Sequence, residues 1–255
     1  MVWEGASARI NNIESFEICE YGFRPTDEDI RILFPMLPQG NSNPNQHRSS
    51  DDWRSLFDGK SLKGWHGYNK KGKINNWKVE DGALICLGKI SGVDYGGDLV
   101  SDDAFENFEL TWEWRVDADA NSGVMYHVEE NISFKAPYET GPEYQILDDA
   151  SYNDVDKNQL AGANYGMYPA IETKELKPLG QWNASRLIYN KGHVEHWLNG
   201  LKVVEFDENS DEWKNLKDAG KWKNFPAYGK FKKGKFCLQD HGHKAYYRNI
   251  QVRKL

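Results

Sequence analysis

The sequence of 255 residues predicts an all-β protein, a two-sheet antiparallel β-sandwich of jelly-roll type with one short helix. Residues 107–117 alternate apolar and polar side chains without error, which is typical of a strand with one buried and one wet face. Residues 185–206 contain three strand-length runs separated by two Gly-containing turns. The second turn is Asn199-Gly200, the favoured pair of a type I′ hairpin. No internal repeat is visible, which disfavours a propeller.

The first fifty residues differ in composition from the rest. A capping pattern at Thr26 predicts a short helix, and residues 39–52 form a polar Asn/Ser/Pro tract without periodicity, typical of a linker. We therefore divide the chain into an N-terminal extension with a polar linker, residues 1–52, and a β-sandwich domain, residues 53–255.

Further elements are predicted within the sandwich domain. Residues 76–86 form another hairpin, and residues 233–240 and 245–255 are the last two strands. The single helix covers residues 211–220, follows Asn209 or Ser210 as its cap, and stops at its terminal glycine.

Composition excludes several classes of partner. The chain has 32 Lys and Arg against 39 Asp and Glu, a formal charge of -7, which argues against a nucleic-acid partner, because such partners require clustered positive charge. No run of about 18 apolar residues is present, so no membrane span is predicted. Its 10 Trp, 13 Tyr and 11 Phe exceed what a core needs and favour stacking on flat ligands such as sugars. Nothing in the sequence specifies an oligomeric state.

Neither a metal nor a cofactor is expected. The three cysteines lack CxxC spacing, and two of them, Cys86 and Cys237, fit core positions in strands. His193 and His196 fall on opposite faces of one strand, and the His241 and His243 pair has no third ligand nearby. The first twelve residues lack the pattern of a signal peptide, so the chain is expected to be cytoplasmic, already processed or wrongly started.

Polar side chains gather on three predicted strands. In residues 141–149, Tyr144 and Ile146 share one face, while Glu143 and Gln145 share the other. Each polar residue alone is more typical of a solvated position than of a site.

The same pattern recurs in the two other strands. Residues 121–130 place Met125 and His127 opposite their apolar set of Val124, Tyr126 and Val128, and residues 235–243 place Gln239 and His241 opposite Phe236 and Leu238. Because three segments show the pattern, we expect one polar ligand face on the outside of a sheet.

The chain from residue 53 to residue 255 resembles the 3-keto-disaccharide hydrolase domain family, which has a concanavalin A-like fold. The ordered segments that carry the resemblance are SLFDGKSLKGW, NWKVEDGALI, NSGVMYHV, GPEYQILDD, GQWNASRLIY, HWLNGLKVVEF and LQDHGHKAYYRNIQVRKL. Many relatives have Arg where this chain has His127. The resemblance implies cleavage of glycosides that carry a ketone at C3 of the sugar, and a periplasmic or secreted location.

That activity requires particular groups. A C3 ketone acidifies the C2 proton, so a base removes it, donors stabilise the enolate, the C1 leaving group departs and water then adds. We expect Glu143 to be the base, with His127 and His241 acting on the enolate oxygen. Contacts to the carbohydrate substrate are expected from the amides, carboxylate and aromatic rings of Gln145, Asp148, Gln239, Asn121, Tyr165 and Trp182.

Two other functions fit the same residues. An ordinary glycosidase would pair Glu143 with Asp148 or Asp240, and the separation of the two carboxylates would decide between retention and inversion. A non-catalytic carbohydrate-binding module would use Tyr165 and Trp182 as a stacking platform.

Overall fold

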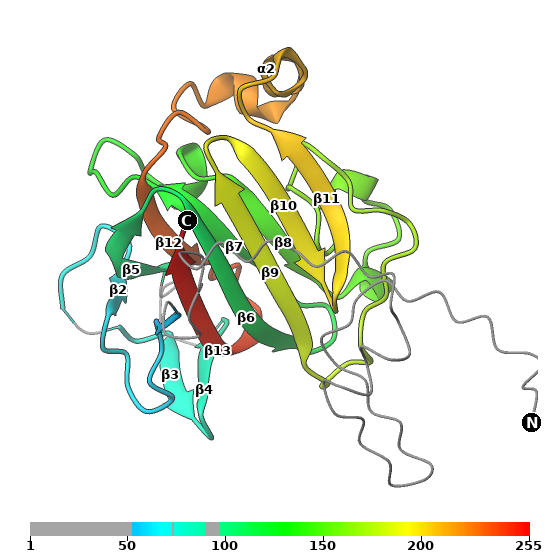
Figure 1. Cartoon of the computed structure of the whole chain (residues 1–255). Coiled ribbons are helices and arrows are strands. Elements are labelled where there is room, and N and C mark those ends of the chain that lie inside the picture. The colour runs from blue at the N-terminus through cyan, green and yellow to red at the C-terminus, as the bar shows by residue number, and fades with distance from the viewer. Residues whose placement is uncertain (1–52, 73, 90–96) are drawn as a thin grey trace, which may run out of the picture. The chain divides into compact units, whose positions relative to one another are not determined.

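The computed structural model describes residues 53–72, 74–89 and 97–255 (Figure 1). The predicted helix at Thr26, the linker at residues 39–52 and hence the extension as a whole lie outside the described residues. No helix in the described ranges is long and apolar enough to cross a membrane.

The described strands form two antiparallel sheets, which confirms the predicted all-β fold. The eight-stranded sheet has the order β11-β10-β9-β6-β13-β4-β3, and β1 also pairs with β13. Its strands are β1 (Arg54–Ser55), β3 (Trp77–Glu80), β4 (Ala83–Leu87), β6 (Phe108–Val116), β9 (Asn183–Asn190), β10 (His193–Leu198), β11 (Leu201–Asp207) and β13 (Lys244–Lys254).

The five-stranded sheet has the order β2-β5-β12-β7-β8. Its strands are β2 (Trp65–Gly67), β5 (Leu99–Phe105), β7 (Asn121–Val128), β8 (Glu143–Leu147) and β12 (Gly234–Leu238). Most strands that neighbour one another in this sheet are distant in sequence. Residues near positions 100, 124, 144 and 237 therefore come together in one sheet.

The core lies between the sheets and follows the predicted alternation. Phe108 and Leu110 of β6 are buried in it, as are Tyr144 and Ile146 of β8. The alternate residues of the five-stranded sheet face outward, where a smaller apolar cluster forms from Tyr68, Val100, Met125, Val128 and Cys237. The outer face of this sheet is therefore apolar in its middle and polar toward β8.

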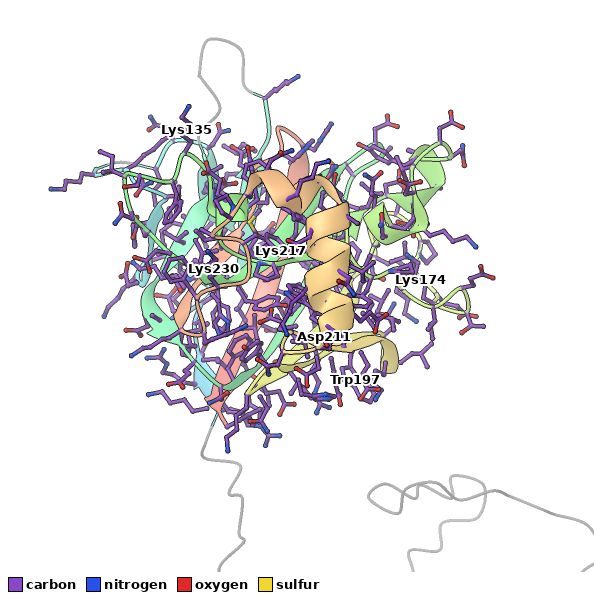
Figure 2. All side chains as sticks on the ribbon, turned by 90° about the horizontal axis from the view of Figure 1, so that it is seen from above. Lys135, Lys174, Trp197, Asp211, Lys217 and Lys230 are labelled. Atoms are coloured by element: carbon purple, nitrogen blue, oxygen red, sulfur yellow. The ribbon has the colours of Figure 1, made fainter. Side chains whose placement is uncertain are left out.

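The turn residues between β10 and β11 have the conformation that the sequence predicts. Asn199 and Gly200 both have positive φ, 49° and 85°, as a type I′ hairpin between β10 and β11 requires. The only α-helix in the described part of the chain is α2 (Asp211–Ala219), whose cap is Ser210, because its hydroxyl accepts from the Trp213 N–H at 3.1 Å. Figure 2 shows this helix with Asp211 and Lys217 labelled; these charges complement the helix dipole, since Asp211 lies in the first turn and Lys217 in the last.

Four 3₁₀ helices complete the described loops. They are η2 (Pro137–Glu139), η3 (Asp149–Ser151), η4 (Lys157–Gln159) and η5 (Lys221–Asn224). The last begins directly after Gly220, which ends α2 as the sequence predicts.

Candidate functional site

A pocket of about 250 Å³ opens on the outer face of the five-stranded sheet. Its floor comes from β7, β8 and the segment that directly follows β12. Its walls come from η2, from the loop after η4 and from η5 with the residue that follows it. The lining residues are Asn121, Tyr138, Glu143, Gln145, Tyr165, Lys221, Trp222, Phe225, Gln239 and His241. The pocket thus brings together Glu143, Gln145, Gln239, His241, Asn121 and Tyr165, six of the residues that the sequence assigns to a site.

Strand register explains this convergence. Gly123 of β7 pairs with Gln145 of β8, and the Gln239 N–H donates to the Gly123 carbonyl oxygen at 2.9 Å. The side chains of Gln239 and Gln145 therefore flank a glycine that presents only backbone to the pocket. Glu143 pairs with Met125, one step along the same face.

Glu143 is the buried carboxyl group of this pocket, with only 3% of the residue exposed. A Cβ at Gly123 would lie 2.0 Å from Glu143 Oε1, so the carboxyl group occupies the space above that glycine. Within the described ranges, its oxygens form no hydrogen bond or ion pair. Burial raises the pKa of Glu143 to about 8; the charge of Lys221 acts in the opposite direction, and that of Asp98 adds to the rise.

The two amides differ in how firmly they are held. Gln145 Nε2 donates to the Gln159 carbonyl oxygen at 3.0 Å, and Gln145 Oε1 accepts from the Ile146 N–H at 3.1 Å. One N–H of this rigid amide remains available to a ligand. The side-chain oxygen of Gln239 is buried and has no hydrogen-bond partner among the described residues.

His241 lies in the wall of the pocket and is exposed. Desolvation and then the neighbouring His243 lower the pKa of His241, and the two rings stack with centroids 5.8 Å apart. The neutral imidazole is therefore favoured near neutral pH, and it offers one donor and one acceptor.

Sequence analysis missed four lining residues, which are Tyr138, Lys221, Trp222 and Phe225. Tyr138 lies on η2, and the others lie on or directly after η5, so the period of the strands carries no information about them. Tyr138 and Phe225 meet edge to face with centroids 5.4 Å apart and form an aromatic rim. The one available signal was the Lys- and aromatic-rich run from 221 to 225, which follows the helix stop.

The predicted position of His127 on the ligand face is wrong. His127 has a φ of 53°, and the pairing of β7 with β12 shifts by one residue at this point, which is a β-bulge. The bulge turns His127 into the sandwich, where its ring contacts Tyr189 at 4.3 Å between centroids, and its Nε2 lies 2.9 Å from the Glu106 carbonyl oxygen. Burial lowers the pKa of His127 to about 4, so the ring is neutral. Val128 moves to the outer face in exchange.

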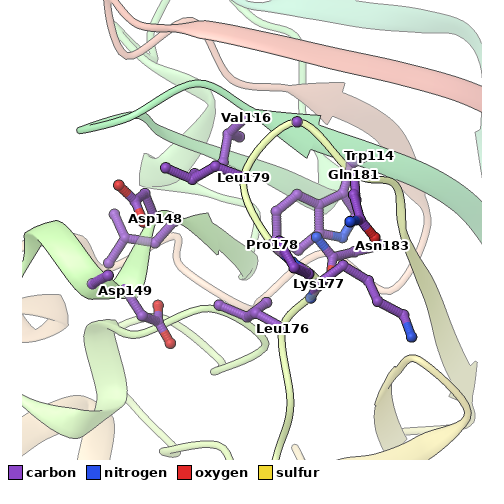
Figure 3. Close-up of a pocket in the computed structure, with 13 residues that line it drawn as sticks. Trp114, Val116, Asp148, Asp149, Leu176, Lys177, Pro178, Leu179, Gln181 and Asn183 are labelled. Carbon is purple, nitrogen blue, oxygen red and sulfur yellow. Dashed lines mark hydrogen bonds between the residues drawn. The ribbon is translucent and has the colours of Figure 1, made fainter.

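Asp148 does not reach the pocket of Glu143. It lines a second pocket of about 290 Å³, and Figure 3 shows Asp148 and Asp149 on one side of it and Trp114 on the other. Asp148 Oδ2 accepts from Ser151 Oγ at 2.6 Å and from the Asp119 N–H at 3.0 Å. The carboxylate therefore shapes the loop after β8, which contradicts its predicted place beside the substrate.

Trp182 is also misplaced by the sequence prediction. It packs beside Tyr246 on the outer face of the eight-stranded sheet, whereas the pocket lies on the five-stranded sheet. The guanidinium groups of Arg248 and Arg115 lie 4.1 and 5.3 Å from its ring centroid. Its ring therefore serves cation–π contacts on another surface.

The two histidines of β10 lie on opposite faces, as predicted. His196 is buried against Tyr144 in the core, whereas His193 faces outward. His193, Glu195 and Glu205 form the one group in the described chain whose ligand atoms lie close enough together to hold a metal ion. Lys202 Nζ already lies 2.6 Å from Glu205 Oε2, so an ammonium group shares this surface.

Comparison with known proteins shows which family the chain belongs to. Residues 52–253 match the family described as the 3-keto-alpha-glucoside-1,2-lyase-like domain. A 3-keto-disaccharide hydrolase of Bacteroides thetaiotaomicron is 33% identical over 231 residues, which are 81% of this chain and 79% of that protein.

Two solved structures from Parabacteroides distasonis are also similar. One candidate glycosyl hydrolase has a TM-score of 0.73 at 41% identity, covering 80% of this chain and 94% of that one. A second has a TM-score of 0.62 at 28% identity, covering 80% and 99%. The family that the ordered sequence motifs indicate is thereby confirmed, and the chain belongs to the 3-keto-alpha-glucoside-1,2-lyase-like domain family.

Proposed function

We propose that this protein cleaves glycosides whose sugar carries a ketone at C3, by removing the C2 proton, eliminating the C1 substituent and adding water. The observation that carries the proposal is a single buried carboxyl group, Glu143, with a pKa raised to about 8, at the floor of the pocket. The names of the family and of the 33% identical relative support the substrate class.

The reaction begins at C2 of the 3-keto sugar. The Glu143 carboxylate takes the C2 proton, and the C–H electron pair forms the C2–C3 double bond of an enolate. The enolate then expels the C1 substituent as its C1–O bond breaks, and the leaving oxygen takes a proton. Water adds across the resulting C1–C2 double bond and restores a 3-keto sugar, so the net reaction is hydrolysis. A base whose pKa lies near the working pH suits the removal of a carbon-bound proton.

The other residues of the pocket supply hydrogen bonds to the sugar, proton transfer at the leaving oxygen and aromatic contacts. Gln145 is held by two hydrogen bonds and keeps one N–H for the sugar, and the amide of Gln239 lies across Gly123 from it. The neutral imidazole of His241 is suited to move a proton to or from the leaving oxygen. Tyr165 and the rim of Tyr138 and Phe225 offer rings for a sugar face.

The ordinary glycosidase mechanism has less support, because it requires two carboxylates at one bond. Asp148 lines the other pocket. Asp240 is committed to a loop: its Oδ2 accepts from Asn76 Nδ2 at 2.8 Å, and its Oδ1 accepts from the Gly242 N–H at 3.0 Å. Among the residues that line the described pocket, Glu143 is the only carboxylic acid.

The test compares a 3-keto disaccharide with its unoxidised parent in deuterated water. We expect cleavage of the 3-keto sugar alone, with deuterium entering at C2. Cleavage of both sugars would favour the glycosidase, and binding without cleavage would favour the carbohydrate-binding module. Cleavage of the 3-keto sugar without C2 exchange or a C2 isotope effect would overturn the elimination mechanism.

A further inference from the structure

Lys221 is the lysine that lines the Glu143 pocket, and aromatic rings hold its ammonium group. Nζ lies 4.1 Å from the centroid of the Tyr165 ring and 4.3 Å from that of Trp222. Both contacts are attractive, because the faces of aromatic rings carry negative charge. The two rings therefore keep the ammonium group at the pocket wall.

The core fixes the backbone of Lys221. The next residue, Trp222, is fully buried, and its ring stacks on Tyr228 with centroids 4.0 Å apart. Trp222 Nε1 also donates to the Tyr165 carbonyl oxygen at 3.2 Å, which ties η5 to the loop that carries the other ring. A side chain at Gly166 would press on Trp222 Nε1 at 3.1 Å. The position of Lys221 is thus set by packing and not by a free loop.

Lys221 lacks an anionic partner, unlike several other lysines. Lys174 pairs with Asp149, Lys232 with Glu208 and Lys235 with Glu130. Within the part of the chain that the structure describes, Lys221 Nζ forms neither an ion pair nor a hydrogen bond with an acceptor.

The ammonium group and Glu143 affect each other across the pocket. The positive charge of Lys221 lowers the pKa of Glu143 against the effect of burial, and desolvation lowers the pKa of Lys221 while Glu143 raises it. The two groups therefore share one electrostatic environment although they are not in contact as an ion pair.

We propose that Lys221 is a catalytic residue whose ammonium group stabilises the oxyanion that forms at C3 of the sugar when Glu143 removes the C2 proton. This role rests on the proposed function. In that step the carboxylate becomes neutral, the C–H electron pair forms the C2–C3 double bond, and the carbonyl electron pair moves onto the C3 oxygen. Negative charge thus passes from Glu143 to the substrate within one pocket, and a cation fixed there by aromatic rings stabilises it as it develops.

The test uses Lys221→Met, Lys221→Arg and, as the matched control, Lys223→Met. Lys223 lies on the same 3₁₀ helix, is exposed and does not line the pocket. We expect Lys221→Met to lower kcat and the rate of C2 deuterium exchange on the 3-keto disaccharide by on the order of 10²-fold. Lys221→Arg should restore part of both rates, and Lys223→Met should match the wild type.

A second readout needs no substrate. In the free protein, carbon NMR of the labelled Glu143 carboxyl group should show a higher pKa in Lys221→Met than in the wild type, because the positive charge that lowers this pKa is removed. An unchanged titration contradicts the shared environment.

The outcomes separate the two proposals. Wild-type exchange at C2 with undiminished exchange in Lys221→Met overturns the role of Lys221 alone. A loss confined to KM, with kcat unchanged, also overturns it, because it would show uniform binding only. A wild type without C2 exchange overturns the proposed function and, with it, the oxyanion role.

Discussion

The carboxyl group of Glu143 lies so close to Gly123 that a Cβ at position 123 would come within 2.0 Å of Glu143 Oε1 and 2.8 Å of Cδ. The glycine has no positive φ, so its role concerns space and not backbone conformation. Any other residue at this strand position would place a side chain here. Because Gly123 has none, it leaves room for the carboxyl group from the neighbouring strand. Glu143 can therefore lie across the sheet toward Gln145 and Gln239.

We expect Gly123→Ala to displace the Glu143 carboxyl group and to lower kcat on a 3-keto disaccharide by about 10²-fold, since a shift of about 1 Å has such an effect. Steady-state kinetics and thermal unfolding check this. Gly67→Ala in β2 is the control, because the three atoms nearest to its added Cβ belong to the flexible side chain of Lys70, at 3.3 Å or more. Wild-type kcat in Gly123→Ala would contradict the assignment.

The pH profile should report Glu143. Because the base acts in its deprotonated form and burial raises the pKa of Glu143 to about 8, kcat/KM should rise with pH through about 8. Glu143→Gln keeps the shape but cannot accept the proton, so turnover should cease while a 3-keto sugar still binds. Initial rates from pH 5 to pH 10 and calorimetric binding measure both. An active Glu143→Gln enzyme would remove Glu143 from the mechanism.

Glu143 should also make stability depend on pH. Its pKa is raised from 4.5 to about 8 in the folded protein, so its contribution is fully present below pH 4.5 and is lost as pH rises through about 8. The free energy of unfolding of the wild type should therefore fall relative to that of Glu143→Gln, by on the order of a few kcal/mol between pH 5 and pH 9. Urea unfolding measures this difference. A pH-independent difference between the two proteins would show that the carboxyl group is not buried as an acid.

His127 should matter for stability and not for chemistry. His127→Ala removes a ring that packs against Phe108 and Tyr189 in a residue that is only 1% exposed. We expect the free energy of unfolding to fall by on the order of 2–4 kcal/mol. Turnover per folded molecule at low temperature should stay within about twofold of the wild type. His193→Ala, at an outward position, is the control for stability. A 10²-fold loss of kcat with unchanged stability would contradict this prediction and would support a catalytic role for His127.

Periodic segments were predictable because their signal is local. The alternation over residues 107–117 places Phe108 and Leu110 in the core, and the Asn199-Gly200 pair forms the expected hairpin turn. The same local rule assigns Glu143 and Gln145 to the outer face of β8. Side chains on a regular strand alternate between faces wherever the strand lies, so no knowledge of its neighbours is needed.

The remaining features depend on partners that are distant in the chain. His127 changes face because β7 bulges where it pairs with β12, more than a hundred residues later, and a bulge reverses the parity of every residue after it. Lys221 and Tyr138 line the same pocket as Glu143 only because segments from two regions of the chain fold over one sheet. Alternation decides which way a strand residue points, but strand order and loop packing decide what it meets, because those contacts form between segments whose separation in sequence carries no periodic signal.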